Sequence, residues 1–405
     1  MRQVCSILST YTADVSGVCS ALYEMGGMVI MHDASGCNST YNTHDEPRWY
    51  DTPSMVYISA LSEHEAILGD DEKLIKDVCH AAKELYPRFI AVAGTPIPMM
   101  MGTDFPSVAK EIEKRTGIPT FGFATNGMHS YLCGESMAFR AITERFCSTY
   151  AKSTEENSNP APGSSKSISV NLLGVTPLDF SVTGNAESIK KLCNENDIKV
   201  QCCFSMGSSF DELMNCTDAD VSWVLSSSGL SQAKYLEKEF NIPYIIGVPI
   251  GEIYTKRLFS DLKEAALTGK SRPFFHVRED APQPDKCDKA APSYITGEPV
   301  FAASLRNALE AERDIKGLRI LTPLENLCDR DMLRSRDITE AEEDDFFRLY
   351  EDADLIFADP LFKPALSDSS HARFISIPHE ACSGRIFRKD IPVLIGKGFK
   401  KLYIE

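Results

Sequence analysis

The residues best suited to metal chemistry lie in a turn that follows the apolar run 28–31. Residues 32–37 spell His-Asp-Ala-Ser-Gly-Cys, so a thiol follows a tight turn of small residues directly after a predicted buried strand. Thiolates bind the iron of iron–sulfur clusters, and backbone N–H groups beside the sulfur tune the reduction potential. Cys37 is therefore a candidate cluster ligand, and a buried thiol at a strand end is the alternative interpretation.

A second thiol precedes this turn in the chain. Cys19 lies in a segment whose small residues Ser16, Gly17 and Ser20 predict the start of a helix. Its closeness to the turn in sequence makes Cys19 the best local candidate for a second cofactor ligand. No motif surrounds it, which favours the competing interpretation of a small side chain packed inside the protein.

The chain has thirteen cysteines in 405 residues, and their spacing excludes several kinds of site. No two cysteines are spaced C-x-x-C, which excludes a zinc ribbon, a thioredoxin-type site and a ferredoxin-type cluster loop. The odd number, together with an N-terminus that lacks the apolar run of a signal peptide, favours reduced thiols over a disulfide framework. Such liberal use of thiols suits an anaerobic cytosol, and we expect a cytoplasmic protein.

Composition argues against two further classes of partner. Lys and Arg number 42 against 58 Asp and Glu, a formal net charge of −16. Nucleic-acid binding requires clustered basic residues, so we expect no nucleic-acid partner. No stretch approaches the roughly 18 uninterrupted apolar residues of a membrane span, so we expect no membrane partner.

Two polar breaks divide the chain into three parts. Residues 152–165 are rich in Pro, Ser and Asn, and residues 271–292 are rich in Pro and charged residues. Such segments do not bury a core and are typical of linkers. We therefore predict an N-terminal domain at 1–151, a central domain at 166–270 and a C-terminal domain at 293–405.

Short apolar runs alternate with segments of helical spacing in each part. The predicted strands are 28–31, 89–94, 118–123, 169–174, 198–204, 221–226, 242–248, 318–322, 354–358 and 373–377. The predicted helices are 105–117, 186–196, 231–240, 299–312 and 340–351. This alternation predicts an α/β protein of three Rossmann-like domains, each a mainly parallel sheet flanked by helices. Ligands are expected at the carboxyl ends of the strands and in the cleft between domains.

Several other residues have two interpretations each. His32 is expected to be structural, and His129 is either a substrate-facing acid or an exposed or satisfied side chain. The methionine run 99–101 is expected to pack beneath the cleft. Residues 226–229 either hold an anion at a helix N-terminus or form a plain turn. The acidic run 342–345 is expected to be a solvated helix face.

Four motifs together resemble a known family. Residues 32–37 are similar to His-Gly-x-x-Gly-Cys, with Asp33 in place of the first glycine, and the acidic segment 62–74 resembles a second hallmark. Residues 95–104 are similar to Cys-Pro followed by Gly-Asp-Asp, and 122–127 to Gly-Phe-x-x-x-Gly. These are hallmarks of the nitrogenase component 1 large-subunit family, which includes the dark-operative protochlorophyllide and chlorophyllide reductases and the reductive cyclase of coenzyme F430 synthesis.

The resemblance implies an oxidoreductase subunit of three parallel α/β domains. It implies electrons from an ATP-dependent iron–sulfur reductase that resembles the nitrogenase iron protein, and a substrate reduced in the cleft between the domains. It also implies a second component 1-like subunit, in a homo- or heterodimer or a tetramer. The implied cofactor is an iron–sulfur cluster of the 4Fe–4S type near Cys37. It would be shared across the subunit interface, because one thiolate per chain is too few to hold a four-iron cluster.

Three positions depart from the family pattern. Thr12 and Thr95 stand where the family has its other two cluster cysteines, and Leu225 stands near the position of the nitrogenase cofactor cysteine. A nitrogenase-type molybdenum cofactor is therefore not expected, and dinitrogen is not the expected substrate. These departures keep open a non-catalytic partner or scaffold subunit for cofactor binding or assembly. A small-molecule or metal-chelate binding protein without a cluster is a third alternative.

Overall fold

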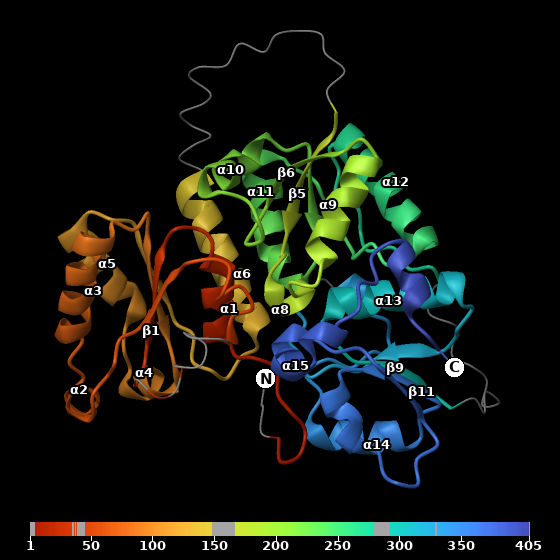
Figure 1. Ribbon diagram of the computed structural model, residues 1–405. Coiled ribbons are helices and arrows are strands. Elements are labelled where there is room, and N and C mark those ends of the chain that lie inside the picture. Colours follow the sequence, from red (N-terminus) through yellow and green to blue (C-terminus); the bar gives the residue numbers. More distant parts are fainter. Residues whose placement is uncertain are drawn as a thin grey trace.

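Three four-stranded parallel sheets, one from each third of the chain, form the framework of the protein (Figure 1). The computed structural model describes residues 5–34, 36, 38, 45–147, 167–278, 291–328 and 330–404. In each sheet the first strand lies between the second and the third, and the fourth lies at the edge beside the third. The strand order of each sheet therefore reverses between the first and the third strand. Open α/β sheets bind ligands outside the carboxyl ends of the strands at this point of reversal.

The strands have the following bounds in the three sheets. The first sheet contains β1 (Met28–His32), β2 (Met55–Ile58), β3 (Ile90–Gly94) and β4 (Thr120–Phe123). The second contains β5 (Ser169–Leu173), β6 (Lys199–Cys203), β7 (Val221–Val224) and β8 (Tyr244–Ile246). The third contains β9 (Ser293–Ile295), β10 (Leu318–Ile320), β11 (Leu355–Ala358) and β12 (Arg373–Ser376). The central strands are buried along their whole length, as parallel strands covered on both faces must be.

Helices connect the strands and cover the sheets. Those of the first part are α1 (Asp14–Leu22), α2 (Glu63–Leu68), α3 (Glu72–Leu85), α4 (Pro96–Met101), α5 (Phe105–Thr116) and α6 (Tyr131–Ile142). The second part has α8 (Pro177–Phe180), α9 (Asn185–Glu195), α10 (Phe210–Met214), α11 (Leu230–Phe240) and α12 (Glu252–Thr268). The third has α13 (Pro299–Glu312), α14 (Glu343–Glu351) and α15 (Glu380–Phe387). The predicted α/β class is confirmed, and the predicted helices occur within a few residues of their expected bounds.

Two central helices cross at a distance that only glycine permits. A Cβ atom on Gly134 of α6 would lie 1.8 Å from the carbonyl oxygen of Asp14, and one on Gly17 of α1 would lie 2.0 Å from that of Tyr131. The backbones of α1 and α6 are therefore in direct contact, between the first and second sheets (Figure 1). This crossing fixes the position of the residues that follow Gly134 on α6.

One hydrophobic core is continuous through all three parts of the chain. Its buried members include Val29 of β1, Leu172 of β5 and Ile295 of β9. Two smaller clusters lie beside it, one between the first sheet and its helices α3 and α5, and one mainly around the third sheet. The three sheets thus share a common interior. The predicted domain boundaries stay a prediction, because the linker 152–165 and most of 271–292 lie outside the described residues.

One expectation about surface segments was wrong. Met99 and Met100 are 46% and 83% exposed and do not pack beneath a cleft, because α4 is a short surface helix that follows β3. In the acidic run, Glu343 is not simply solvated. Its carboxylate accepts hydrogen bonds from the backbone N–H groups of Ser6, Ile7 and Leu8 at 2.7–2.8 Å, and these bonds lower its pKa.

Among the described residues, no helix has both the length and the apolar character that a membrane span requires.

Candidate functional site

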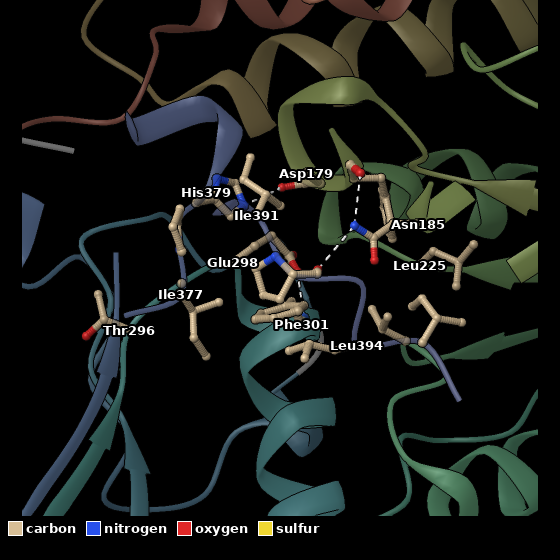
Figure 2. Close-up of a pocket in the computed structure, with 16 residues that line it drawn as sticks. Asp179, Asn185, Leu225, Thr296, Glu298, Phe301, Ile377, His379, Ile391 and Leu394 are labelled. Carbon is tan, nitrogen blue, oxygen red and sulfur yellow. Dashed lines mark hydrogen bonds and ion pairs between the residues drawn. The ribbon is translucent and has the colours of Figure 1, made fainter. Parts of the chain in front are cut away.

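A pocket lies where the carboxyl ends of the second and third sheets face each other (Figure 2). Leu225 and Val248 line it from the ends of β7 and β8, and Thr296 and Ile377 line it from the ends of β9 and β12. Its location agrees with the general rule for parallel sheets. One part of the wall is apolar, and includes Phe301 and Leu394 as well as Leu225 and Ile377. The other part carries ionisable groups.

Asp179 and His379 form the ion pair at the polar part of the wall (Figure 2). Asp179 lies on α8, one turn after Thr176, the residue that precedes this helix, and His379 precedes α15 after β12. The Nε2 atom of His379 is 3.3 Å from Oδ1 of Asp179, and the hydroxyl of the buried Tyr131 donates to the same oxygen. Burial alone would lower the pKa of His379, but the hydrogen bond and charge of Asp179 outweigh it and raise that pKa.

Glu298 is the second carboxyl of the wall, and two backbone N–H groups hold it. It precedes α13, where its Oε2 accepts from the N–H of Phe301 at 2.7 Å, while its Oε1 accepts from the N–H of Ser227 at 2.9 Å. One N–H group of residues 226–229 thus binds the protein's own carboxyl, and an external anion at this turn stays a prediction. Burial and the charge of Asp179 raise the pKa of Glu298, against the lowering effect of these hydrogen bonds.

Glu135 is a third buried carboxyl beside the pocket, although it does not line the pocket itself. It follows Gly134 on α6 and is fully buried. Its Oε1 accepts a hydrogen bond from Oγ1 of Thr176 at 2.6 Å, at the start of the helix that carries Asp179. Burial, followed by the charge of Asp179, raises the pKa of Glu135 well above its ordinary value.

We call Glu135, Asp179, Glu298 and His379 the junction cluster, because they come from all three parts of the chain. The pKa values of three of its members are raised, which favours the protonated forms of Glu135, Glu298 and His379. Three of its buried atoms, Oε2 of Glu135, Oδ2 of Asp179 and Nδ1 of His379, have no hydrogen-bond partner among the described residues. Of these three atoms, those of Asp179 and His379 belong to residues that line the pocket.

The sequence did not single out any member of the junction cluster. A weak signal was present, because Asp179, Glu298 and His379 each follow a strand by a few residues, where parallel sheets place their ligand-binding groups. No comparable signal marks Glu135, which is an interior residue of a helix.

The sequence-predicted cluster ligand Cys37 follows β1 in the chain and lies outside the described residues. Thr12 and Cys382 line one hollow together with Asn38. The hydroxyl of Thr12 donates to the carbonyl of Ala381 at 2.9 Å, and burial raises the pKa of the Cys382 thiol well above its ordinary value.

The described residues near this turn do not form a complete ligand set for a 4Fe–4S cluster. Such a cluster takes about four thiolates. Thr95 is buried, and its hydroxyl donates to the carbonyl of His32 at 2.9 Å, so it packs as a structural residue. Among the described residues that line the hollow, Cys382 is the one cysteine. A complete set would need Cys37 and thiolates from another chain.

Three other residues that the sequence singled out, Cys19, His32 and His129, also lie in the first part of the chain. Cys19 is fully buried in α1 within the shared core, and burial raises the pKa of its thiol; its ligand role stays a prediction. His32 is buried at the end of β1, its Nδ1 lies 2.8 Å from Oγ of Ser59, and burial lowers its pKa to about 4. It is therefore neutral at physiological pH, and its structural role stays a prediction. His129 is half-exposed and lies 3.4 Å from Glu325.

Comparison with protein families and curated proteins gives a consistent result. The model of the nitrogenase component 1 type oxidoreductases matches residues 14–304. A light-independent protochlorophyllide reductase subunit from Pyropia yezoensis is 22% identical over 210 residues, and the same subunit from Leptolyngbya boryana is 24% identical over 212 residues. Each match covers 52% of this chain but 41% of the relative, so the match spans less than half the length of these curated relatives.

Two solved structures share the fold over nearly the whole chain. The structure titled "Nitrogenase Cp1 at pH 6.5" has a TM-score of 0.62 and 18% sequence identity, and the match covers 93% of this chain and 87% of that one. The structure at pH 5 has a TM-score of 0.61 and 16% identity, with 94% and 85% covered.

Proposed function

Since the chain belongs to the family of nitrogenase component 1 type oxidoreductases, we propose that it is a subunit that reduces a substrate held in the pocket beside the junction cluster. The substrate is one other than dinitrogen. The electrons come from an ATP-dependent iron–sulfur reductase of the nitrogenase iron protein kind, and a second component 1-like subunit completes the enzyme.

The junction cluster is the observation that carries this proposal. Reduction of an unsaturated bond consumes protons as well as electrons, so the pocket needs groups that hold protons near neutral pH. The bond to Asp179 raises the pKa of His379 against the effect of burial, and burial raises the pKa of Glu298 to about 7, so both groups are suited to proton transfer near neutral pH. Both line the pocket, within reach of a bound molecule. The apolar wall formed by Phe301, Ile377 and Leu394 excludes water from such a molecule.

The cofactor proposed for the electrons is a 4Fe–4S cluster shared between subunits, with Cys37 as a ligand from this chain. An iron–sulfur cluster supplies one-electron transfer when it is bound. The described residues alone do not complete its ligand set, so this part of the proposal rests on Cys37 and on a second chain.

An exposed apolar patch supports a partner at this edge of the molecule. Ile67 and Leu68 of α2 are 75% and 63% exposed, and α2 lies against α4, which carries the exposed Met99 and Met100. Helix α4 begins directly after β3, and in the sequence the turn that contains Cys37 follows β1, the strand beside β3. Contiguous exposed apolar side chains mark interaction surfaces. The second subunit is therefore proposed to cover α2, α4 and this turn.

A non-catalytic partner or scaffold subunit is the second candidate function. The hydroxyls of Thr12 and Thr95 at the family's cysteine positions, and the apolar side chain of Leu225 in the pocket, favour it. In this role the chain would complete a dimer and present a cofactor that another subunit uses.

Anaerobic purification followed by turnover separates the two candidates. The enzyme should be brown, contain about 4 iron atoms per dimer and show a reducible spectrum. Cys37→Ala should abolish the iron, whereas the matched control Cys79→Ala, on the surface helix α3, should retain it. An iron-free wild-type protein that Cys37→Ala leaves unchanged would exclude the cluster and leave only binding or scaffold roles.

The His379→Gln variant then tests the pocket itself. With a reductase, ATP and the partner subunit present, turnover should fall by roughly 10²–10⁴-fold, because the substrate loses a proton donor. The iron content should not change, since His379 lies at the pocket between the second and third sheets and not at the Cys37 turn. Normal turnover by this variant would contradict a role for the junction cluster and favour the partner or scaffold role.

A further inference from the structure

A group of three metal-ligating side chains lies outside the junction cluster. The ligand atoms of His129, Cys133 and Glu325 all lie within 4.8 Å of one another. His129 and Cys133 flank the start of α6, and Glu325 lies in the loop that follows β10. The group therefore spans the boundary between the first and third parts of the chain.

The geometry of this group is close to that of a bound ion. A tetrahedral site with metal–ligand bonds of about 2.0–2.3 Å separates its donor atoms by roughly 3.3–3.8 Å. Nδ1 of His129 is 3.4 Å from Oε1 of Glu325, inside this range. The remaining donor separations need side-chain adjustments of about 1 Å or less to reach the tetrahedral range.

The carboxylate of the group is held in place from both sides. The N–H of Ser130 donates to Oε1 of Glu325 at 3.2 Å, and the hydroxyl of Ser130 donates to its Oε2. The preceding loop is held in turn by Asp14, whose carboxylate accepts from the N–H groups of Asn126 and Gly127 at 3.0 and 2.8 Å. Little rearrangement is therefore needed before a metal binds.

The electrostatic surroundings favour a cation. Besides Glu325, the carboxylates of Asp14 and Glu340 act electrostatically on the Cys133 thiol, and such negative charge attracts a divalent ion. A thiol releases its proton when it binds a metal ion. His129 is half-exposed, so an ion and a water ligand can reach the site from solvent.

We propose that His129, Cys133 and Glu325 bind one divalent transition-metal ion of the zinc class. Imidazole, thiolate and carboxylate are together the donor set that Zn²⁺ accepts, and three protein ligands leave the fourth position for water. The ion ties α6 to the loop after β10. Because α6 also carries Glu135 and Tyr131, the ion stabilises the helix that positions part of the junction cluster. This site is independent of the proposed reduction and of the Cys37 turn.

Cobalt is the probe that tests this site, because tetrahedral Co²⁺ with a thiolate ligand absorbs visibly. The full-length chain, reduced, stripped of metal and kept anaerobic, is titrated with Co²⁺ and then with Zn²⁺. One equivalent of Co²⁺ should produce thiolate-to-cobalt charge transfer and intense d–d bands, and Zn²⁺ should remove both. Cys133→Ala should abolish the charge transfer, and His129→Ala should weaken Co²⁺ binding by at least about tenfold.

Two control variants make the result specific. Cys79→Ala and Cys37→Ala each remove a different thiol and should keep the charge-transfer band. Three results would overturn the proposal: the charge-transfer band persists in Cys133→Ala, it is lost in either control variant, or it never forms in the wild type. Thermal unfolding provides a second readout. Zn²⁺ should raise the midpoint of the wild type but not that of His129→Ala, whose midpoint without metal should match the wild type because this side chain is half-exposed.

Discussion

At the scale of single residues, the main feature of this protein is that three carboxyl groups and a histidine share one buried site. Asp179 is the centre of the group, because Tyr131 and His379 both bond to its Oδ1. Its charge raises the pKa of Glu135 and of Glu298, after the larger effect of burial on both. Burial and the charge of Asp179 therefore both favour the protonated forms of these two carboxyl groups.

The stability of the protein should therefore depend on pH through Glu135. Its folded-state pKa is raised above the ordinary value of 4.5, so above that value the folded state binds more protons than the unfolded state. The stabilisation is fully present below the ordinary value and is lost as pH rises through the raised pKa. Glu135→Gln stays neutral, and Thr176 can still donate to it. Its unfolding midpoint should fall less than that of the wild type when pH rises from about 5.5 to about 8.

The exposed Glu187→Gln on α9 is the control for this measurement, and its profile should follow that of the wild type. Thermal unfolding followed by circular dichroism over this pH range gives the comparison. A Glu135→Gln profile as steep as that of the wild type would show that Glu135 does not carry the effect.

At the scale of elements, the crossing of α1 and α6 decides where the junction cluster forms. Gly17 and Gly134 allow the two backbones to touch, and Tyr131 and Glu135 lie within the same stretch of α6. Helix α6 is thereby fixed against α1 in the first part of the chain. Its buried polar side chains bond to the second part, Tyr131 to Asp179 of α8 and Glu135 to Thr176 just before α8.

Gly134→Ala should therefore be strongly destabilising. The added Cβ would lie 1.8 Å from the carbonyl oxygen of Asp14, and backbone atoms cannot move aside as a flexible side chain can. We expect a loss of about 3 kcal/mol or more in the free energy of unfolding, at the upper end of overpacking effects. Met137→Ala, on the exposed face of the same helix, should change it by about 0.5 kcal/mol or less. Chemical denaturation measures both, and similar values for the two variants would contradict direct backbone contact.

At the scale of the whole molecule, buried polar contacts tie the sheets together in addition to the shared core. The guanidinium of Arg48 is 5% exposed, bonds to Glu46 at 2.6 Å and to Glu24 at 3.0 Å, and donates to the carbonyl of Ser205 at 2.6 Å. Ser205 belongs to the second part of the chain, so a single side chain joins the first two parts.

Arg48→Met should cost about 3–5 kcal/mol of unfolding free energy, because it leaves the fully buried carboxylate of Glu46 without this countercharge. Arg88→Met is the matched control. Arg88 also joins the first two parts, through an ion pair of 2.8 Å with Asp211, but both side chains are at least half-exposed. Exposed pairs contribute only about 0–1 kcal/mol. Equal losses in the two variants, measured by urea denaturation, would contradict the assignment of Arg48 as the dominant contact.

Much of the architecture was predictable from local patterns. Buried strands such as β3 appear as short apolar runs, and helices such as α5 appear as apolar residues at helical spacing, because each pattern follows from the geometry of its own element. The order of these elements predicts parallel sheets, and the parallel sheets predict binding at their carboxyl ends. The four motifs of the first part predicted the family in the same way, since they are contiguous in sequence.

The junction cluster was not predictable in this way. Glu135, Asp179, Glu298 and His379 belong to four segments spread over more than half of the chain, and each segment alone has an ordinary structural interpretation. The same holds for His129 and Glu325, which meet only across the boundary between two parts. Period and composition encode the type of an element and the face it buries, but not which loops of separate sheets meet. The packing of the sheets against one another decides which loops meet. The same packing buries the junction cluster, and this burial raises the pKa values of its members.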